Sequence, residues 1–420
     1  MQDSEALSSP QRLIHATLEI WRARGNAGVS ARLLGQEAGL PVSSIYHHFG
    51  SLEQLFASAQ EDARARAERW CATRLDAFAA ADSLTVEALP ALMAALIDDW
   101  AQDQRLLAFA WRESMVMAAR DSHYLPAVQG WQALWREFWR EICARCGLAA
   151  ASEITSLMFC GEGALHLMQW RRPVDRAGLD ETCRGWGEWL AGRLTPEGPW
   201  RHFARTEASR AMPELTLRGD TAERIATAAA DTVEELGMAG LTHRAVAARA
   251  GLTLGVVSYN FRTSADLARA AFEAIYRRIV PSAASPQARL VPDAPAAFEA
   301  LVGYDILSPR LAAMDEVMAT VARDAELGPF APQLRYLRGR TAGSQLQGLV
   351  GPDRLVSPAD AALLSAFSGG QRFACLGMEE TEMRLFLRRT LGDVTDMLGA
   401  QAALKPSIAR NRHRNYPELP

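Results

Sequence analysis

A long-period internal repeat constrains this chain more than any other feature of its sequence. Residues 12–55 align with residues 224–267 at a constant offset of 212, without a gap. A weaker match follows, in which Ala119-Arg120-Asp121 corresponds to Ala322-Arg323-Asp324. The identical pairs in the main repeat are Arg12/Arg224, Ala16/Ala228, Gly25/Gly237, Ala27/Ala239, Gly28/Gly240, Arg32/Arg244, Ala38/Ala250, Gly39/Gly251, Leu40/Leu252, Phe49/Phe261 and Leu55/Leu267. Duplication of a unit of about 200 residues is the simplest explanation for a chain of this length.

Both copies are predicted to be helical throughout. Apolar residues recur at helical spacing after candidate caps at Ser9 and Asp220, and glycines end these first helices. Ser30 and Thr242 then begin a short helix in each copy. A glycine turn follows, then a second short helix, and the segment from Ser51 opens a long charged helix in the first copy.

Two short helices joined by a glycine-containing turn form the helix-turn-helix plan. In the first copy the string is Arg12-Leu-Ile, Ala16, Gly25, Val29-Ser30, Ala38-Gly39-Leu40, Ile45-Tyr46-His47-His48-Phe49 and Leu55. In the second copy it is Arg224-Ile225, Gly237, Leu241-Thr242, Ala250-Gly251-Leu252 and Val257-Ser258-Tyr259-Asn260-Phe261. Each string resembles the DNA-binding segment of the TetR family of bacterial transcription regulators.

Proteins of that family are usually homodimers in which each chain joins a helix-turn-helix domain to a larger helical ligand-binding domain. The resemblance therefore implies an all-α fold with two TetR-like units in tandem, forming an intramolecular pseudo-dimer. The expected segments are a helix-turn-helix domain at 1–55, a helical ligand-binding domain at 56–195, a linker at 196–219, a second helix-turn-helix domain at 220–267, a second helical domain at 268–404 and a basic tail at 405–420. The halves are expected to meet through helices at about 152–194 and 358–400, where Gly161, Gly163, Gly369 and Gly370 allow close approach.

The resemblance also implies which residues read DNA, because the second helix of the motif enters the major groove. The first reader would use Arg32, Ser43, Ser44, Tyr46 and His47. The second would use Arg244, Thr253, Gly255, Val256, Ser258 and Tyr259. Because the two sets share almost nothing, we expect one chain to bind an asymmetric double-stranded operator.

The pattern departs from the family in its phosphate contacts. The family usually carries a lysine where this chain has Leu52 and Ser264, and the N-terminal arm carries Asp3 and Glu5. Fewer phosphate contacts predict weaker binding with a shallow salt dependence. The tail residues Lys405, Arg410, Arg412, His413 and Arg414 could supply contacts, or could form a solvated end.

Aromatic and sulfur-containing side chains in the first half suggest a ligand site for a small apolar or aromatic effector. The candidate residues are Trp111, Met115, Trp135, Met158, Glu162, His166 and Trp170. A stripe at this spacing can equally be helix core. Glu162 within an apolar run is either paired with His166 or available to a ligand, and Arg112 and Glu113 are weaker candidates of the same kind.

Composition and motifs exclude several other classes. A net charge of −4 leaves no large positive field for bulk nucleic-acid binding, so any DNA contact must be local. The chain has no apolar run long enough for a membrane span and no secretory signal, so we expect it in the cytoplasm. Catalytic, cofactor and phosphate-loop motifs are missing, and Cys143-x-x-Cys146 lacks further ligands for a metal site. We therefore expect no enzyme activity, cofactor or metal.

The sequence thus favours a ligand-responsive transcription regulator, most simply a repressor, that acts as a monomeric pseudo-dimer with further dimerisation open. Two alternatives remain. One is a regulator with a single working DNA reader. The other is a helical small-molecule binder, or an enzyme, that has lost DNA binding.

Overall fold

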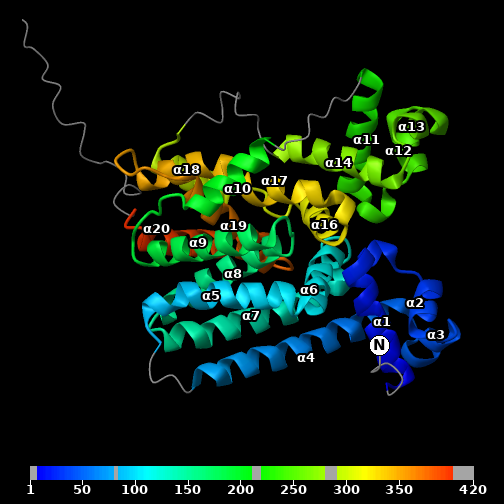
Figure 1. Cartoon of the computed structure of the whole chain (residues 1–420), viewed down its shortest axis with the longest axis horizontal. Coiled ribbons are helices and arrows are strands. Elements are labelled where there is room, and N and C mark those ends of the chain that lie inside the picture. Colours follow the sequence, from blue (N-terminus) through cyan, green and yellow to red (C-terminus); the bar gives the residue numbers. More distant parts are fainter. Residues whose placement is uncertain (1–6, 80–83, 211–218, 280–290, 401–420) are drawn as a thin grey trace, which may run out of the picture.

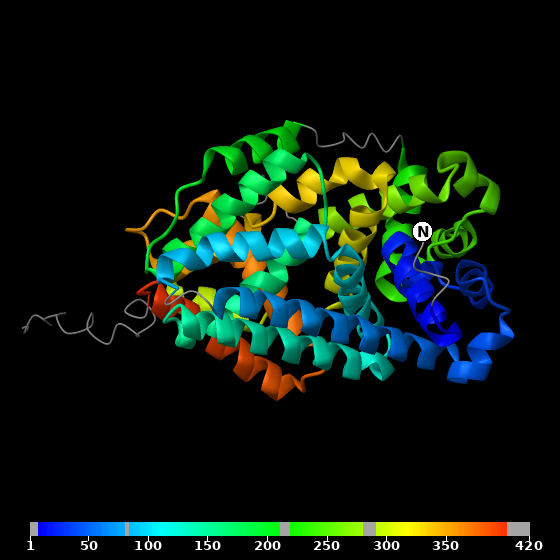
Figure 2. The same ribbon diagram turned by 60° about the horizontal axis from the view of Figure 1, so that its bottom comes forward.

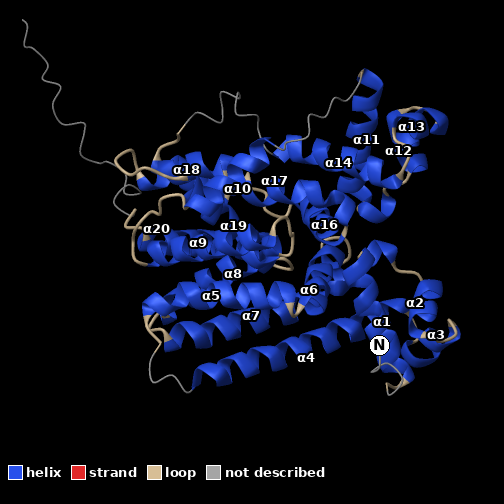
Figure 3. Cartoon of the chain, viewed as in Figure 1, coloured by secondary structure: helices blue, strands red, loops and turns tan. Residues whose placement is uncertain are grey.

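The computed structural model describes residues 7–79, 84–210, 219–279 and 291–400, and its regular elements there are helices (Figure 3). The helices before residue 211 are α1 (Ser9–Arg24), α2 (Ala31–Ala38), α3 (Ser43–Phe49), α4 (Leu52–Ala79), α5 (Leu89–Gln102), α6 (Arg105–Ala118), α7 (Leu125–Arg145), α8 (Ser152–His166), α9 (Arg172–Leu190) and α10 (Pro199–Arg210). Those after residue 218 are α11 (Asp220–Leu236), α12 (His243–Ala250), α13 (Leu254–Asn260), α14 (Ser264–Ile279), α15 (Ala294–Val302), α16 (Pro309–Arg323), α17 (Ala331–Tyr336), α18 (Arg340–Val350), α19 (Pro358–Cys375) and α20 (Glu380–Met397). The predicted all-α class is confirmed.

The two three-helix groups α1–α3 and α11–α13 lie at the same end of the molecule (Figures 1 and 2). Helices α6 and α16 lie between these groups and the rest of the chain, and they contact each other. The remaining helices form an elongated body behind them, in which α4, α5 and α7 run side by side (Figure 1).

The local geometry of α1–α3 recurs in α11–α13. The hydroxyl oxygens of Ser30 and Thr242 each accept a hydrogen bond from the backbone N–H three residues later. Gly39 and Gly251 end α2 and α12 in the left-handed region, with φ of 61° and 62°. This conformation favours glycine, which explains its presence in both turns.

The start of the first helix in each group differs from our prediction. Ser8, rather than Ser9, caps α1, because its backbone N–H donates to the side-chain oxygen of Gln11 three residues later. Gly219 caps α11, and Asp220 is its first helical residue. The paired arginines of these helices have equivalent roles, since Arg12 donates to the carbonyl of Gly39 and Arg224 to that of Ala250.

Helices α8 and α19 make the most extensive helix–helix contact in the body. A Cβ on Gly161 would collide with the carbonyl oxygen of Ala366, and a Cβ on Gly370 would collide with that of Leu157. The two contacts are reciprocal, because Leu157 and Ala366 each stand four residues before the glycine of their own helix. Small residues here let the two backbones touch.

The other two glycines predicted to serve this approach do not serve it. A Cβ on Gly163 would meet nothing within 4 Å, and one on Gly369 would make an ordinary contact of 3.7 Å with Gly161. Gly163 therefore stands away from the contact, whereas Gly369 lies beside Gly161 with room for a methyl group, a difference that the sequence pattern alone could not resolve.

The segment 196–219, expected as a linker, contains helix α10. Ala204 and Ala208 are buried four residues apart, and they pack with Val174, Tyr336 and Leu337. Arg201 is also buried, and its guanidinium donates to the hydroxyl of Thr182 at 2.7 Å. Much of the connection between the halves is therefore docked against the body. Residues 211–218 of the expected linker lie outside the described part of the chain, as do Asp3, Glu5, Lys405, Arg410, Arg412, His413 and Arg414.

The close contact of α8 and α19 yields a test with matched positions. We expect Gly161→Ala and Gly370→Ala to lower the free energy of unfolding, because the added methyl groups displace facing backbone. Gly163→Ala lies in the same helix with open space, so it should stabilise by up to about 1 kcal/mol through helix propensity. Urea unfolding followed by tryptophan fluorescence measures all three. Equal effects at positions 161 and 163 would contradict the close contact.

Candidate nucleic-acid interface

The first candidate reader is α3, which presents polar side chains to solvent. Ser43, Tyr46 and His47 are exposed, whereas Ser44 is half-buried. Ile45 is fully buried and anchors the helix to its three-helix group. On the preceding helix, Arg32 is exposed and makes no ion pair within the described part of the chain. These predicted contacts, apart from Ser44, are therefore free to reach a ligand.

The second candidate reader, α13, has the same form with different chemistry. Thr253, Gly255, Ser258 and Tyr259 are exposed, and Tyr259 is the most exposed of them at 81%. Val257 is buried in the position that corresponds to Ile45. Val256 is half-buried and packs against the core of its group, so less of its side chain can meet a thymine methyl than the sequence argument assumed.

Arginine and helix-end amides are available around both readers for phosphate contacts. Arg244 and Arg262 are exposed and join no ion pair among the described residues. The hydroxyl of Ser51 caps α4 by accepting from the backbone N–H of Gln54. His243 on α12 hydrogen-bonds the carbonyl of Phe261 at 2.8 Å, which holds the end of α13 in place. Both readers therefore have an exposed arginine at one corresponding position, Arg32 and Arg244, and the second reader has Arg262 in addition.

The predicted ligand-site tryptophans form part of a closely packed aromatic core. Trp111 and Trp135 are fully buried, with ring centroids 5.2 Å apart. Trp100 and Trp131 also belong to the cluster, and Phe373 of the second half contacts Trp111. Met115 and Met158 are also buried in this core, whereas Trp170 is half-buried and lies next to Tyr336 elsewhere. Their role in ligand binding stays a prediction.

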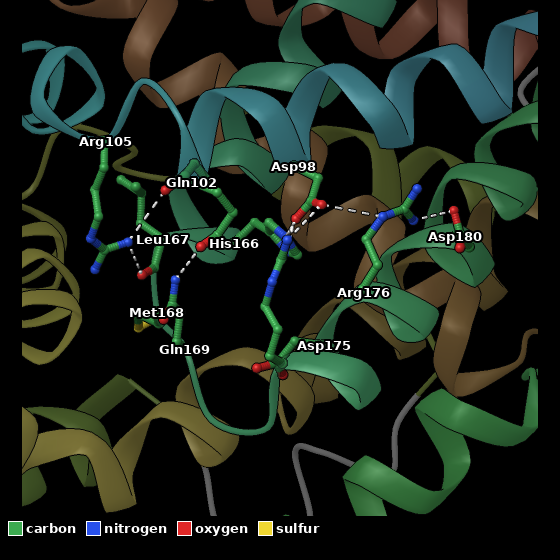
Figure 4. Close-up of polar contacts among 12 residues, drawn as sticks. Asp98, Gln102, Arg105, His166, Leu167, Met168, Gln169, Asp175, Arg176 and Asp180 are labelled. Atoms are coloured by element: carbon green, nitrogen blue, oxygen red, sulfur yellow. Dashed lines mark hydrogen bonds and ion pairs between the residues drawn. The ribbon is translucent and has the colours of Figure 1, made fainter.

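Glu162 and His166 are both buried, but each has a partner other than the expected one. An oxygen of Glu162 lies 4.0 Å from the guanidinium of Arg338. The Nε2 atom of His166 lies 2.9 Å from Asp98 (Figure 4). Its Nδ1 atom accepts a hydrogen bond from Arg335. Because Nδ1 is an acceptor, Nε2 carries the proton and donates a hydrogen bond to Asp98. The Glu162–His166 pairing considered from sequence is therefore replaced by contacts to residues far away in the chain.

This polar cluster shifts the pKa values of its members. Burial and the positive charge of Arg335 lower the pKa of His166 to about 4, despite its bond to Asp98. Burial by itself would raise the pKa of Asp98, but hydrogen bonds from His166 and Arg172 lower it overall. Asp98 also pairs with Arg176, which bridges to Asp180 (Figure 4). The cluster is thus built with a neutral imidazole and an ionised carboxylate.

Arg112 and Glu113, the weaker candidates, are also committed to partners. Arg112 faces Asp315, with 3.4 Å between Nη2 and Oδ1, and Glu113 pairs with Arg323. In the second half, a small cavity of about 30 Å³ lies between α15, α19 and α20, next to Tyr304, Ser368 and Gln371. This volume suits about one water molecule. A larger, open hollow of about 420 Å³ lies on the surface of the second half, where residues of α11 and α12 line it, and none of the predicted ligand-site residues does.

Residues 13–59 match the family model described as "Bacterial regulatory proteins, tetR family". The match spans α1, α2 and α3, and the beginning of α4. It supports a DNA-binding transcription regulator of the TetR family. No curated protein matches the chain. Within the described residues, no helix combines the length and the apolar character needed to cross a bilayer, and no cluster of three side chains could hold a metal ion.

Sequence reasoning missed most partners of the buried charges. Asp98 lies on α5, Arg335 on α17 and Arg338 in the turn after α17, all far in the chain from Glu162 and His166, so nothing in the local pattern connects them. A signal did exist for one group of contacts. The repeated Ala-Arg-Asp triplets contain Arg120 and Arg323, and both arginines bind across the two halves of the chain.

The lowered pKa of His166 predicts a pH dependence of stability. Between pH 6.5 and about 4 the unfolded chain binds a proton that the folded chain excludes, so stability should fall as the pH falls through this window. The contribution of this histidine is at most roughly 3 kcal/mol. We expect His166→Asn to flatten the acid limb of urea-unfolding free energies. The exposed His202→Asn is the control, and an unchanged slope in His166→Asn would contradict the assignment.

Proposed function

We propose that this chain is a ligand-responsive transcriptional repressor in which two different helix-turn-helix readers, α3 and α13, bind one asymmetric operator in the cytoplasm. The observation that carries the proposal is the matched placement of the readers. Both lie at one end of the molecule, both rest on a buried apolar anchor, and their exposed side chains differ at almost every corresponding position. The match of residues 13–59 to the tetR family model supports DNA as the partner.

A pseudo-dimer of two TetR-like units within one chain fits the contacts between the halves. The packing of α8 against α19 is reciprocal, as expected for units related by an approximate two-fold axis. Glu113 and Glu316 occupy corresponding positions in the two halves. Arg112 and Asp315, which directly precede them, therefore correspond as well. They face each other directly, and Arg372 also binds Asp315 at 2.6 Å.

This central pair favours association of unlike halves. In a homodimer, a residue on the two-fold axis meets its own copy, so arginine would face arginine, or aspartate would face aspartate. Buried like charges repel, whereas Arg112 and Asp315 attract. The pair therefore favours association of a first half with a second half over association of two like halves, which fits a chain that acts as a monomeric pseudo-dimer.

An apolar or aromatic effector would require the body to open. The tryptophan cluster is packed ring against ring, and the cavity between α15, α19 and α20 is small. A compound that prefers a state with separated helices could shift the readers in proportion to its differential affinity. The residues Trp111, Met115, Trp135, Met158, Glu162, His166 and Trp170 remain the proposed lining of that state.

A regulator with one working reader is the second candidate. It is favoured by the second reader's side chains, since Gly255 offers no side chain and Val256 packs inward. In that case α11–α13 would act as a structural partner for α1–α3. A helical protein that binds small molecules without DNA is disfavoured by the exposed, unpaired Arg32 and Arg244.

Footprinting of the gene's upstream DNA tests the asymmetric operator. We expect Arg32→Ala and Arg244→Ala to weaken protection of different half-sites, each by roughly 1–3 kcal/mol if the arginine contacts a guanine. Arg140→Ala, an exposed arginine on α7, is the control. Loss of protection in Arg32→Ala with none in Arg244→Ala would select the single-reader form. Preferred binding of a perfect palindrome by two chains would contradict the asymmetric operator.

The central charge pair makes a second prediction. Asp315→Asn leaves two buried arginines without their carboxylate, so we expect a loss on the order of 3–5 kcal/mol in unfolding free energy. Glu299→Gln removes an exposed carboxylate from the Arg388 pair and should cost about 1 kcal/mol or less. Urea unfolding measures both, and sedimentation at several concentrations should find a monomer for the parent chain. Similar losses in the two variants would argue against a role for this pair.

A further inference from the structure

A pair of crossed ion pairs joins the two halves directly beneath the readers. Glu113 on α6 binds Arg323 at the end of α16, and Glu316 on α16 binds Arg120 just beyond the end of α6, at 2.8 Å. Each glutamate stands seven residues before the arginine of its own half. The second ion pair therefore uses the same two residue types as the first, with each residue now coming from the opposite half. Three of the four side chains are at least nine-tenths buried, and Arg120 is three-quarters buried.

The same side chains hold the backbone of the opposite helix-turn-helix group. Arg323 donates to the carbonyl of Trp21 on α1 at 2.9 Å, and Arg120 donates to that of Val233 on α11 at 2.8 Å. Trp21 and Val233 each stand four residues before the glycine that ends their helix. Both carbonyls already accept from the backbone N–H of that glycine, so each arginine adds a second, charged donor at the carboxyl end of the helix.

The glutamates complete each contact from the other side. The second oxygen of Glu113 accepts from the backbone N–H of Asn26 at 2.9 Å, and that of Glu316 accepts from Met238 at 2.6 Å. These residues begin the 3₁₀ turns η1 (Asn26–Gly28) and η5 (Met238–Gly240), which contact each other. The contacts of Glu113 and Arg323 each have a counterpart in the other set, in which Arg120 also donates to the carbonyls of Glu234 and Glu235.

Gly25 and Gly237 leave the space that these contacts need. Both have positive φ, of 70° and 72°. A Cβ on Gly25 would lie 2.7 Å from Nη1 of Arg323, and one on Gly237 would lie 2.9 Å from Oε2 of Glu316. Glycine is therefore required twice at each point, once by the backbone and once by the arriving charged side chain.

We infer that Glu113, Arg120, Glu316 and Arg323 are positioning residues that set the distance between the two readers. Each arginine joins the end of its own half's central helix to the first helix of the other half's reader group. Neither reader can move without stretching buried, charge-assisted hydrogen bonds. This inference rests on the proposed function, because a fixed distance between readers selects the spacing of two half-sites.

A distance measurement without DNA tests the positioning role. Gln36 and Ala248 are exposed, occupy corresponding places on α2 and α12, and can each be replaced by cysteine for spin labelling. The six native cysteines are buried. Double electron–electron resonance should find one narrow distance distribution in the parent chain. We expect it to broaden in Arg120→Gln and in Arg323→Gln, and most in the double variant.

A matched control separates positioning from general ion-pair loss. Arg388→Gln removes another inter-helix arginine pair, that with Glu299, within the body and should leave the distribution unchanged. Circular dichroism verifies folding. If the double glutamine variant does not fold, Arg120→Lys with Arg323→Lys replaces it, because lysine keeps the charge but loses the multiple bonds. An unchanged narrow distribution in the folded double variant overturns the inference.

A DNA experiment distinguishes this inference from the proposed function. Base pairs are inserted between the two protected half-sites of the footprinted DNA. The parent chain should lose binding on insertion, whereas the double variant should bind the original and the lengthened sites with similar affinity. If the parent chain protects no DNA, the proposed function fails while the distance measurement still decides the positioning role. Equal sensitivity of both proteins to insertion counts against the inference.

Discussion

The backbone contact between α8 and α19 is the constraint on which the rest of the structure depends. Gly161 and Gly370 let the two helices approach so closely that each glycine lies against a backbone carbonyl of the opposite helix. This contact determines how the halves of the chain face each other. It brings Arg112 opposite Asp315, and it places α6 and α16 side by side beneath the two reader groups. A methyl group at either glycine would push the two helices apart and so disturb the contacts between the halves.

The charged residues between the two halves include contacts that are the same from both sides and one contact that differs between the sides. The crossed pairs Glu113–Arg323 and Glu316–Arg120 use the same residue types on both sides, so they preserve the approximate symmetry. Arg112 and Asp315 use opposite charges at corresponding positions, so they break it. Buried opposite charges stabilise only when both are present. The interior thus combines symmetric contacts that position the readers with an asymmetric contact that favours unlike halves.

The two halves also differ in their aromatic residues. The first half concentrates its tryptophans in a fully buried cluster around Trp100, Trp111 and Trp135, whereas helices of the second half supply smaller side chains. Phe373 joins this cluster from α19. Large rings fill volume at low conformational cost, so one half acts as the stiffer part of a shared core.

The sequence by itself determined the helical class, the helix-turn-helix elements and most of the exposed residues of the readers, although Ser44 and Val256 are half-buried. These depend on local patterns, such as the caps at Ser30 and Thr242 and the turns at Gly39 and Gly251, which neighbours in the chain encode. The sequence also shows that Arg120 and Arg323 recur in the two halves, but it does not show which residues they bind. Only the tertiary structure decided the partners of buried charges, the docking of α10 and which glycines touch. Those contacts join residues up to about three hundred positions apart, as Arg323 and Trp21 do, and their energies depend on burial that no local pattern records.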